Sequence, residues 1–326
     1  MAGYGRADLA YAAAAAAQAP GPGDGGPAYR LHDGGIDVLV DQRWAAVNPE
    51  SAAHAGRLAA GAGILNARLA LAVRGRPPLV RLRPHRDEPD LLARLRPGPA
   101  RAPTQVEQNL LAAVPRCSVL PVPFGPAPVP IEVRRRLAGV AGAEHGWLDF
   151  ITGRSAVAAV TQMAVAAHQV LAGAHSRVRP TGPEQGSVVS SHPVPGRDPC
   201  PALPGRPNGA WSARGFVPAG GGQLECDPLA VVLGSPMDTP TDDLRAGQAL
   251  QRVLLTVADV HLAAYLLPQV IDVPAAREQL RLALGRSGTP QMVLRVGYAG
   301  PACEPPAATA VADPTRTSRE DRSKVP

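Results

Sequence analysis

The sequence predicts an α+β fold built from two related halves. Each half combines short strands with one long apolar helix, expected at 51–74 in the first half and 244–263 in the second. A helix that is apolar nearly all round is typical of the middle of a core. The two helices also share a pattern. When "LAAGAGILNARLALAVRG" (58–75) is aligned with "LRAGQALQRVLLTVADVHLA" (244–263), Leu58 and Gly61 coincide with Leu244 and Gly247.

A duplication of one ancestral half would explain the repeated helix. Composition offers an alternative explanation, because two buried helices rich in Ala and Leu align this well in so biased a sequence. On the repeat alone, the two explanations have equal weight.

The first half supplies five expected elements in order. "RADLAYAAAAAAQAPG" (6–21) is expected to form a helix, because alanine is a strong helix former and Asp8 interrupts the segment's likeness to an export signal. Residues 27–41 are predicted to form a hairpin with Gly34 and Gly35 at its turn. The central helix follows at 51–74, then an alternating strand at 77–84 and a helix at 104–115 with Thr104 as its N-cap.

The second half begins with the proline-rich stretch 116–130, where regular structure is not expected. A helix follows from 131, then a strand at 147–152 and a helix at 154–176. The segment 178–227 is rich in Pro, Gly and Ser, which is typical of a lid or a disordered loop. Order is expected to return with a strand at 228–234, the second central helix, a helix at 273–284 and a strand at 291–298.

Composition excludes several classes of protein. The net charge is +6, but Lys324 is the only lysine and the arginines are scattered, so no nucleic-acid partner is expected. The four cysteines lie far apart without a C-x-x-C pair, which indicates neither a zinc site nor a disulfide framework and favours a reduced, cytoplasmic protein. No run approaches the roughly 20 apolar residues that span a bilayer, so no membrane partner is expected.

Other motifs are weak. The sequence contains no G-x-S-x-G, H-E-x-x-H or Walker loop. "GPGDGG" (21–26) follows a predicted helix rather than a strand, which argues against a dinucleotide fold. His168 and His175 share a helix face, but such histidines are more often solvated or capping the helix end than binding a metal. Asp238, Asp242 and Asp243 precede the second central helix, where carboxylates favour a helix N-terminus.

Three longer stretches carry a family resemblance: "GAGILNARLAL" (61–71), "LGSPMDTPTDDLRAGQALQRVLLT" (233–256) and "GTPQMVLRVGY" (288–298). They resemble the Acg-type branch of the nitroreductase superfamily, actinobacterial flavin-binding proteins in which two nitroreductase-like halves are fused. The resemblance implies a pseudo-dimer in one chain, with a first half at 1–114 and a second half at 115–298. The tail at 299–326 is polar and contains prolines, so it is expected to be disordered. It also implies flavin mononucleotide (FMN) at the interface between the halves.

The resemblance further identifies flavin contacts. In the phosphate-side stretch "PRCSVLPVPF" (115–124), Arg116 is kept and Ser118 is a neighbouring donor, while Cys117, Pro121 and Val122 stand where the family usually has arginines. Gly234 and Ser235 are expected to let the backbone approach the flavin ring. The ring-side stretch "APGPGDGGPA" (19–28) lacks most of the family's polar and aromatic residues. No catalytic side chain and no metal site is identified.

Two functions follow from the resemblance. The first is an FMN-dependent NAD(P)H oxidoreductase, acting as a monomer on a nitro or quinone acceptor. The second is a pseudoenzyme with an eroded FMN site that sequesters flavin or binds a partner.

Overall fold

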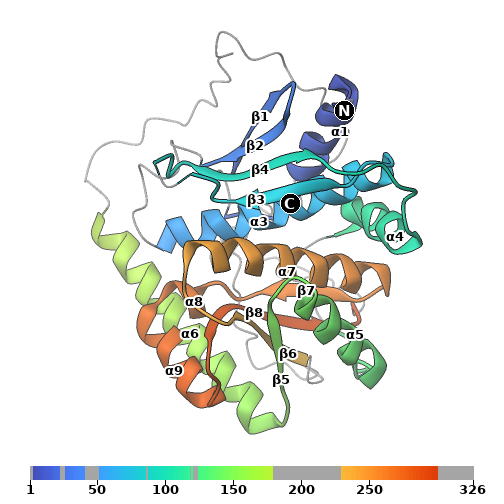
Figure 1. Ribbon diagram of the computed structural model, residues 1–326. Helices are drawn as coiled ribbons and strands as arrows, with labels where there is room; N and C mark the ends of the chain where they lie inside the picture. Colours follow the sequence, from blue (N-terminus) through green and yellow to red (C-terminus); the bar gives the residue numbers. More distant parts are fainter. Residues whose placement is uncertain are drawn as a thin grey trace, which may run out of the picture.

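The computed structural model describes residues 3–22, 26–40, 51–85, 87–117, 119, 124–178 and 229–299. Within them, two four-stranded antiparallel sheets lie on either side of two long helices (Figure 1). The first sheet has the order β1-β2-β4-β3 and the second β5-β6-β8-β7. The strands are β1 (Ala28–His32), β2 (Gly35–Leu39), β3 (Pro78–Leu82), β4 (Leu91–Pro97), β5 (Trp147–Ile151), β6 (Leu229–Ser235), β7 (Ala263–Leu266) and β8 (Thr289–Gly297).

The two sheets follow the same plan. In each, the first strand pairs with the second, the second with the fourth and the fourth with the third. Both second strands carry a register shift near the same place, between Val38 and Leu39 in β2 and between Leu233 and Gly234 in β6. Leu39 therefore corresponds to Gly234, and the first-strand residue opposite each is Ala28 or Trp147.

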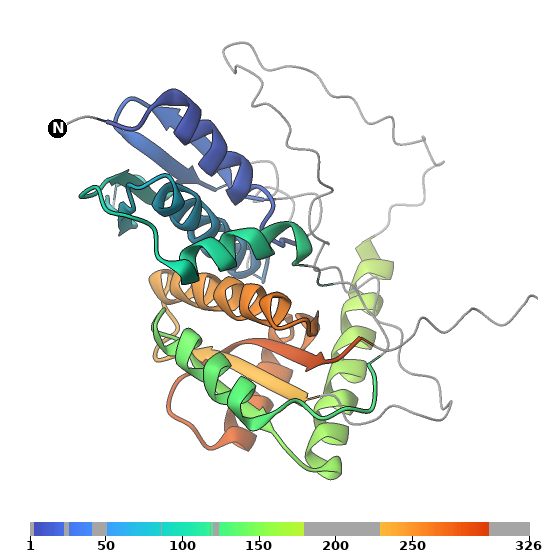
Figure 2. The same ribbon diagram turned by 90° about the vertical axis from the view of Figure 1, so that its right-hand side faces the viewer.

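Helices cover the sheets in layers (Figure 2). Helices α1 and α3 pack on the inner face of the first sheet, and α7 and α5 on the inner face of the second. Helices α6, α8 and α9 cover the outer face of the second sheet. The helices are α1 (Arg6–Ala16), α3 (Ser51–Val73), α4 (Gln105–Ala113), η1 (Val114–Arg116), α5 (Ile131–Gly142), α6 (Arg154–Val178), α7 (Pro240–Asp259), α8 (Gln269–Asp272) and α9 (Pro274–Leu284).

Helices α3 and α7 meet at a pair of glycines. A Cβ atom at Gly61 would overlap the carbonyl oxygen of Leu244, and one at Gly247 would overlap the carbonyl oxygen of Leu58. The contact is reciprocal, because 61 pairs with 247 and 58 with 244 in the sequence alignment of the two helices. Reciprocal contact is the rule at an interface with twofold symmetry. The residues that the alignment superimposes are therefore also the residues that touch.

Two further contacts join residues of the two helices at nearly the same separation along the chain. Arg57 binds Asp243, 186 positions further along the chain, and the buried Asn66 accepts a hydrogen bond from Gln251, 185 positions further along. Contacts at a nearly constant offset require the helices to run in the same direction and in register. Gly61 and Gly247 lie between these two contacts and let the backbones approach closely.

Most expected elements are confirmed. The hairpin, both central helices and the helix after Thr104 are present, and Thr104 forms a capping box with Glu107. The strands β4 and β7 and the short helix α8 were not expected. The loop at 178–227 and the tail at 299–326 lie almost wholly outside the described residues.

One helix, α6, bears on the expectation that the chain contains no membrane-spanning run. Within the described chain, its stretch Arg154–Gly173 is long and apolar enough to cross a membrane, by length and composition alone, and 17% of it is buried. This stretch is apolar enough because it holds many alanines and almost no charged residues, although it contains no long leucine-rich run. A single helix of this kind is weak evidence for a membrane span.

Candidate functional site

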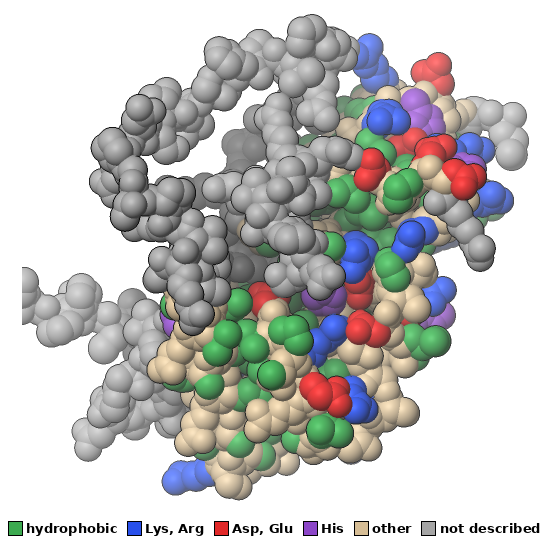
Figure 3. Space-filling model, turned by 90° about the vertical axis from the view of Figure 1, so that its left-hand side faces the viewer, with side chains coloured by type: hydrophobic (Ala, Val, Ile, Leu, Met, Phe, Trp, Pro, Cys, Tyr) green, Lys and Arg blue, Asp and Glu red, His purple; other side chains and the backbone are tan. Residues whose placement is uncertain are grey.

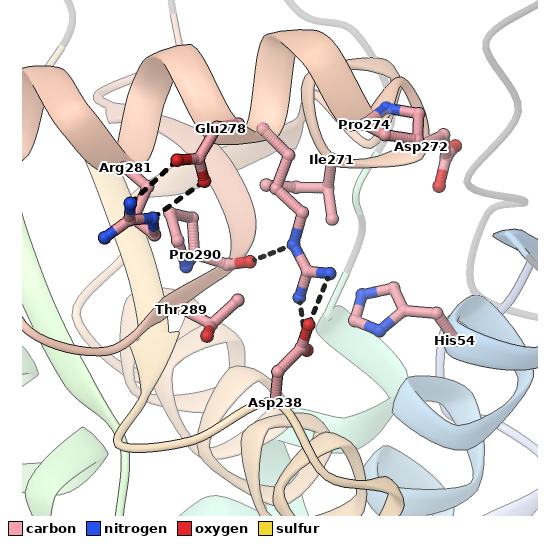
Figure 4. A pocket seen from close by; sticks show the side chains of 10 residues that line it. His54, Asp238, Ile271, Asp272, Pro274, Glu278, Arg281, Thr289 and Pro290 are labelled. Carbon is pink, nitrogen blue, oxygen red and sulfur yellow. Dashed lines mark hydrogen bonds and ion pairs between the residues drawn. The ribbon is translucent and has the colours of Figure 1, made fainter.

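A pocket of about 470 Å³ opens where the first central helix meets the second half (Figure 4). His54 of α3 forms its wall on one side. The other walls come from the β6–α7 connection, the end of α8, the start of α9 and the start of β8. The residues that line it are His54, Asp238, Ile271, Asp272, Pro274, Arg277, Glu278, Arg281, Thr289 and Pro290.

The His54 wall is held by a buried ionic cluster that joins the two central helices. Asp243 lies 3.3 Å from His54 Nδ1 and accepts a 2.7 Å hydrogen bond from Arg57 Nε. On the other side of the ring, His54 Nε2 lies 3.5 Å from the carbonyl oxygen of Gln291. Both neighbours of the ring are acceptor oxygens.

Asp243 stays ionised in this cluster. Burial opposes ionisation, but the hydrogen bonds and positive charges of His54 and Arg57 outweigh it and hold the pKa of the Asp243 carboxyl below its ordinary value. Asp243 therefore does more than favour the N-terminus of α7, where the N-cap itself is Thr239. It links α7 to α3.

Two arginines of α9 also line the pocket, and both are already paired. Arg277 binds Asp238 through both Nη atoms, at 2.9 and 3.3 Å, and donates from Nε to the carbonyl oxygen of Pro290. Arg281 binds Glu278 through two hydrogen bonds of 2.7 Å. These pairs neutralise most of the positive charge that the pocket could offer to an anion.

Asp272 is the carboxyl without such a partner among the described residues. It ends α8, and Figure 4 shows it on the same side of the pocket as His54. Burial raises the pKa of Asp272 to about 6, although His54 and Arg277 act in the opposite direction. The carboxyl therefore exchanges its proton close to neutral pH.

This lining suits a polar ligand with hydrogen-bond donors better than a phosphate. Three carboxylates, at positions 238, 272 and 278, face the cavity, and a phosphate would have to displace Asp238 or Glu278 from an arginine. The pocket is therefore not a phosphate site.

The residues expected at the flavin phosphate lie elsewhere. Arg116 is exposed at the end of η1 and has no ion-pair partner within the described ranges. Ser118 lies outside the described residues. Cys117, between them, is buried, and burial raises the pKa of its thiol to about 12, so it is not a thiolate. Phe124 forms a bridge with Ala299 just beyond the end of β8.

The residues expected at the flavin ring serve an internal contact. A Cβ atom at Gly234 would overlap the indole of Trp147, whose Nε1 donates to the carbonyl oxygen of Ser235 at 3.1 Å. The buried Ser235 hydroxyl donates to the carbonyl oxygen of Met237 and accepts from Gln291 Nε2. The small residue at 234 is therefore explained by Trp147.

Phe124, which ends the phosphate-side stretch, lies far from Gly234 and Ser235. Gly234 and Ser235 pair with Pro290 and Thr289 at the start of β8, whereas Phe124 pairs just beyond its end. Ten residues of extended strand span about 30 Å. No contact among the described residues joins Arg116 to Gly234 or Ser235. The sequence analysis did not identify His54, Asp272 and Arg277 as pocket residues. One sequence signal pointed to this region: Arg57 and Asp243, which coincide in the alignment of the two central helices, carry opposite charges.

Comparison with known proteins gives partial matches. No protein-family model matches the chain. The chain is 30% identical over 206 residues to Putative NAD(P)H nitroreductase Rv3131 of Mycobacterium tuberculosis, which covers 60% of the chain and 58% of that protein. It is 35% identical over 79 residues to Uncharacterized protein Rv3127 of the same species, covering 24% of the chain and 23% of that protein. The chain thus matches less than two thirds of either relative.

Solved structures give weaker matches. The FMN-dependent nitroreductase NfnB from Mycobacterium smegmatis, in complex with NADPH, has a TM-score of 0.34 and 17% identity over 60% of this chain and 89% of that one. A nitroreductase with bound FMN from Bacteroides fragilis has a TM-score of 0.35 and 12% identity over 67% of this chain and 100% of that one. All of these scores are below 0.5.

Proposed function

We propose that the chain is a nitroreductase-like protein of the Acg type, in which two halves, 1–114 and 115–298, form a pseudo-dimer within one monomer. The observation that carries this proposal is the reciprocal contact of Gly61 and Gly247 between two sheets of identical strand order. The 206-residue match to Rv3131 also supports it. The proposal includes the cytoplasmic location expected from the sequence.

FMN is the proposed cofactor, and the described residues fit its phosphate end. Arg116 offers an exposed guanidinium with no described partner, which suits a phosphate. Ser118 is its proposed neighbour. Gly234 and Ser235 are the proposed ring-side contacts, although Trp147 occupies the space in which a Cβ atom at Gly234 would lie. The described residues supply no cradle for the ring.

When bound, FMN supplies the hydride-transfer chemistry, with NAD(P)H as the proposed donor and a nitro or quinone compound as the proposed acceptor. The protein then has to hold the phosphate and exclude water, and no protein acid or base is required by the proposal. Arg116 holds the phosphate by a charge-assisted hydrogen bond.

The test is a titration of the purified protein with FMN, followed by flavin fluorescence. Arg116→Ala should weaken binding by about 10- to 100-fold, because a hydrogen bond to a charged group contributes about 1.5–3 kcal/mol. Arg135→Ala removes another exposed arginine, on α5, and should leave the affinity unchanged. Equal FMN affinities of the unaltered protein and both variants would show that Arg116 is not part of the FMN site.

A pseudoenzyme is the second candidate, and the occupied ring-side positions favour it. Trp147 fills the space beside Gly234, and carboxylates line the described pocket between the halves. In this version the shared helix pair is kept for stability, and the protein sequesters flavin or binds a partner. It predicts that NAD(P)H does not reduce any FMN that the protein retains.

A further inference from the structure

The outer faces of the two sheets differ at equivalent positions. Across the second sheet, the strand register aligns Asp149, Val232 and Val293, and Leu267 bonds to Val293 at the edge. Helices α6, α8 and α9 cover this row, and the three aliphatic residues belong to the apolar cluster beneath them.

Across the first sheet, the equivalent row is charged: Arg30, Asp37, Arg94 and Arg81. None of the described helices packs on this face. Figure 3 shows Arg, Asp, Glu and His side chains close together on the upper part of the molecule, above a lower part with mainly uncharged side chains.

One arginine of this row is used internally. Arg94 binds the buried Asp37 through Nε at 2.6 Å and Nη2 at 3.0 Å. Arg30 and Arg81 are exposed on either side of that pair, and Arg96 is exposed two residues further along β4. These three have no ion-pair partner within the described part of the chain. Three strand spacings place Arg30 and Arg81 about 14 Å apart.

An apolar side chain lies among these arginines. Leu79 alternates with Arg81 on β3, so it lies on the same face, and it is 61% exposed. Arginine is enriched at protein interfaces and among the residues that contribute most to binding. We name the surface formed by Arg30, Leu79, Arg81, Arg94 and Arg96 the arginine face.

Nucleic acid suits this surface less well than a polypeptide. The face carries no aromatic side chain for base stacking, since Tyr29 points inward and bonds to the carbonyl oxygen of Ala16. The turn between β3 and β4 exposes Asp87, Glu88 and Asp90 at one end of the face, where they would repel a phosphate backbone. A short acidic peptide segment, unlike a continuous phosphate backbone, can end before this turn.

We propose that the arginine face docks an acidic polypeptide segment of a partner protein. The segment covers the first sheet as α6, α8 and α9 cover the second, with its carboxylates on Arg30, Arg81 and Arg96 and an apolar residue on Leu79. This site is separate from the proposed flavin site, so either proposal can fail without the other.

The test measures binding of a fluorescent oligo-glutamate peptide to the full chain by anisotropy. The variant Arg30→Ser/Arg81→Ser/Arg96→Ser should weaken binding about tenfold or more, since three charge pairs are lost. The control Arg135→Ser/Arg136→Ser/Arg154→Ser removes the same charge from exposed positions of the second half and should change binding about twofold or less. Leu79→Ser should reduce the affinity for a peptide containing leucine and leave the oligo-glutamate affinity unchanged.

Three outcomes would overturn the proposal. Absence of peptide binding to the unaltered chain would remove the site. Equal losses in the two triple variants would show attraction by net charge alone. Tighter binding of single-stranded DNA or of phosphatidylserine vesicles, lost in the first triple variant only, would replace the polypeptide with that partner. Since all substituted residues are exposed, unchanged melting temperatures serve as the folding control.

Discussion

The two halves of the molecule agree on their inner faces and differ on their outer faces. Inside, each sheet packs on one long helix, and the two helices meet through glycines at equivalent positions. Outside, the second sheet is covered by three helices, whereas the first carries a row of arginines. The inner faces share one interface, so a change in either half must be accommodated by the other. The outer faces have no such constraint.

A second difference concerns the residues at the start of each sheet. The first half pairs Ala28 with Leu39, and the second pairs Trp147 with Gly234. A small residue faces a large one in both halves, with the sizes exchanged. Interiors tolerate changes that conserve total volume, so the two pairs are alternative solutions to the same packing problem.

The largest effect is expected from breaking the shared interface. Gly61→Ala should lower the free energy of unfolding by about 3 kcal/mol, because the new methyl group overlaps the Leu244 backbone and neither helix can yield alone. Gly139→Ala, on α5, meets no atom within 4 Å and should instead stabilise by about 0.5–1 kcal/mol. Urea denaturation compares the two. Similar values would mean that the central helices do not approach this closely.

The charged row of the first sheet can be converted to the apolar row of the second. Asp37→Val should cost about 3 kcal/mol of stability, because it leaves Arg94 without its carboxylate in a half-buried position. Asp37→Val/Arg94→Val reproduces Val232 and Val293 and should recover most of the loss. Chemical denaturation of both variants measures their free energies of unfolding. A double variant no more stable than the single would contradict the equivalence of the rows.

The packing of Trp147 against Gly234 can be tested by a double-mutant cycle. Gly234→Ala should cost about 2 kcal/mol, because the indole of Trp147 must move. In a Trp147→Ala background the same substitution should cost nearly nothing. Thermal melts of the four proteins give the coupling. An equal cost in both backgrounds would show that Trp147 does not explain the glycine.

An effect no larger than the preceding one concerns Asp272 and depends on pH. Burial raises the pKa of Asp272 to about 6 from its ordinary value of 3.8, so the folded state retains a proton that the unfolded state releases. This contribution is full below about pH 4 and is lost as the pH rises to about 6. Asp272→Asn should therefore stabilise at pH 7 by about 2 kcal/mol and show a smaller fall in stability over that range. The difference between parent and variant at each pH is the readout, and a constant difference would contradict the raised pKa.

The sequence predicted the elements whose signal is local. The hairpin at 27–41 carries turn glycines, and the helix at 105–113 carries its own cap. Strand β4 was missed because Leu91, Leu92 and Ala93 form an apolar run without alternation. The pocket was missed because His54 and Asp272 come from distant segments that only tertiary packing brings together. Gly234 was recognised as a place of close approach, but sequence alone could not identify Trp147 as the group that approaches.

The most direct measurement is sedimentation velocity of the chain mixed with FMN, recorded at the visible flavin band. The account predicts that flavin sediments with a monomer of 33.6 kDa, because the interface between the halves lies within one chain. Flavin that stays at the meniscus, or that sediments only with a dimer, would contradict it.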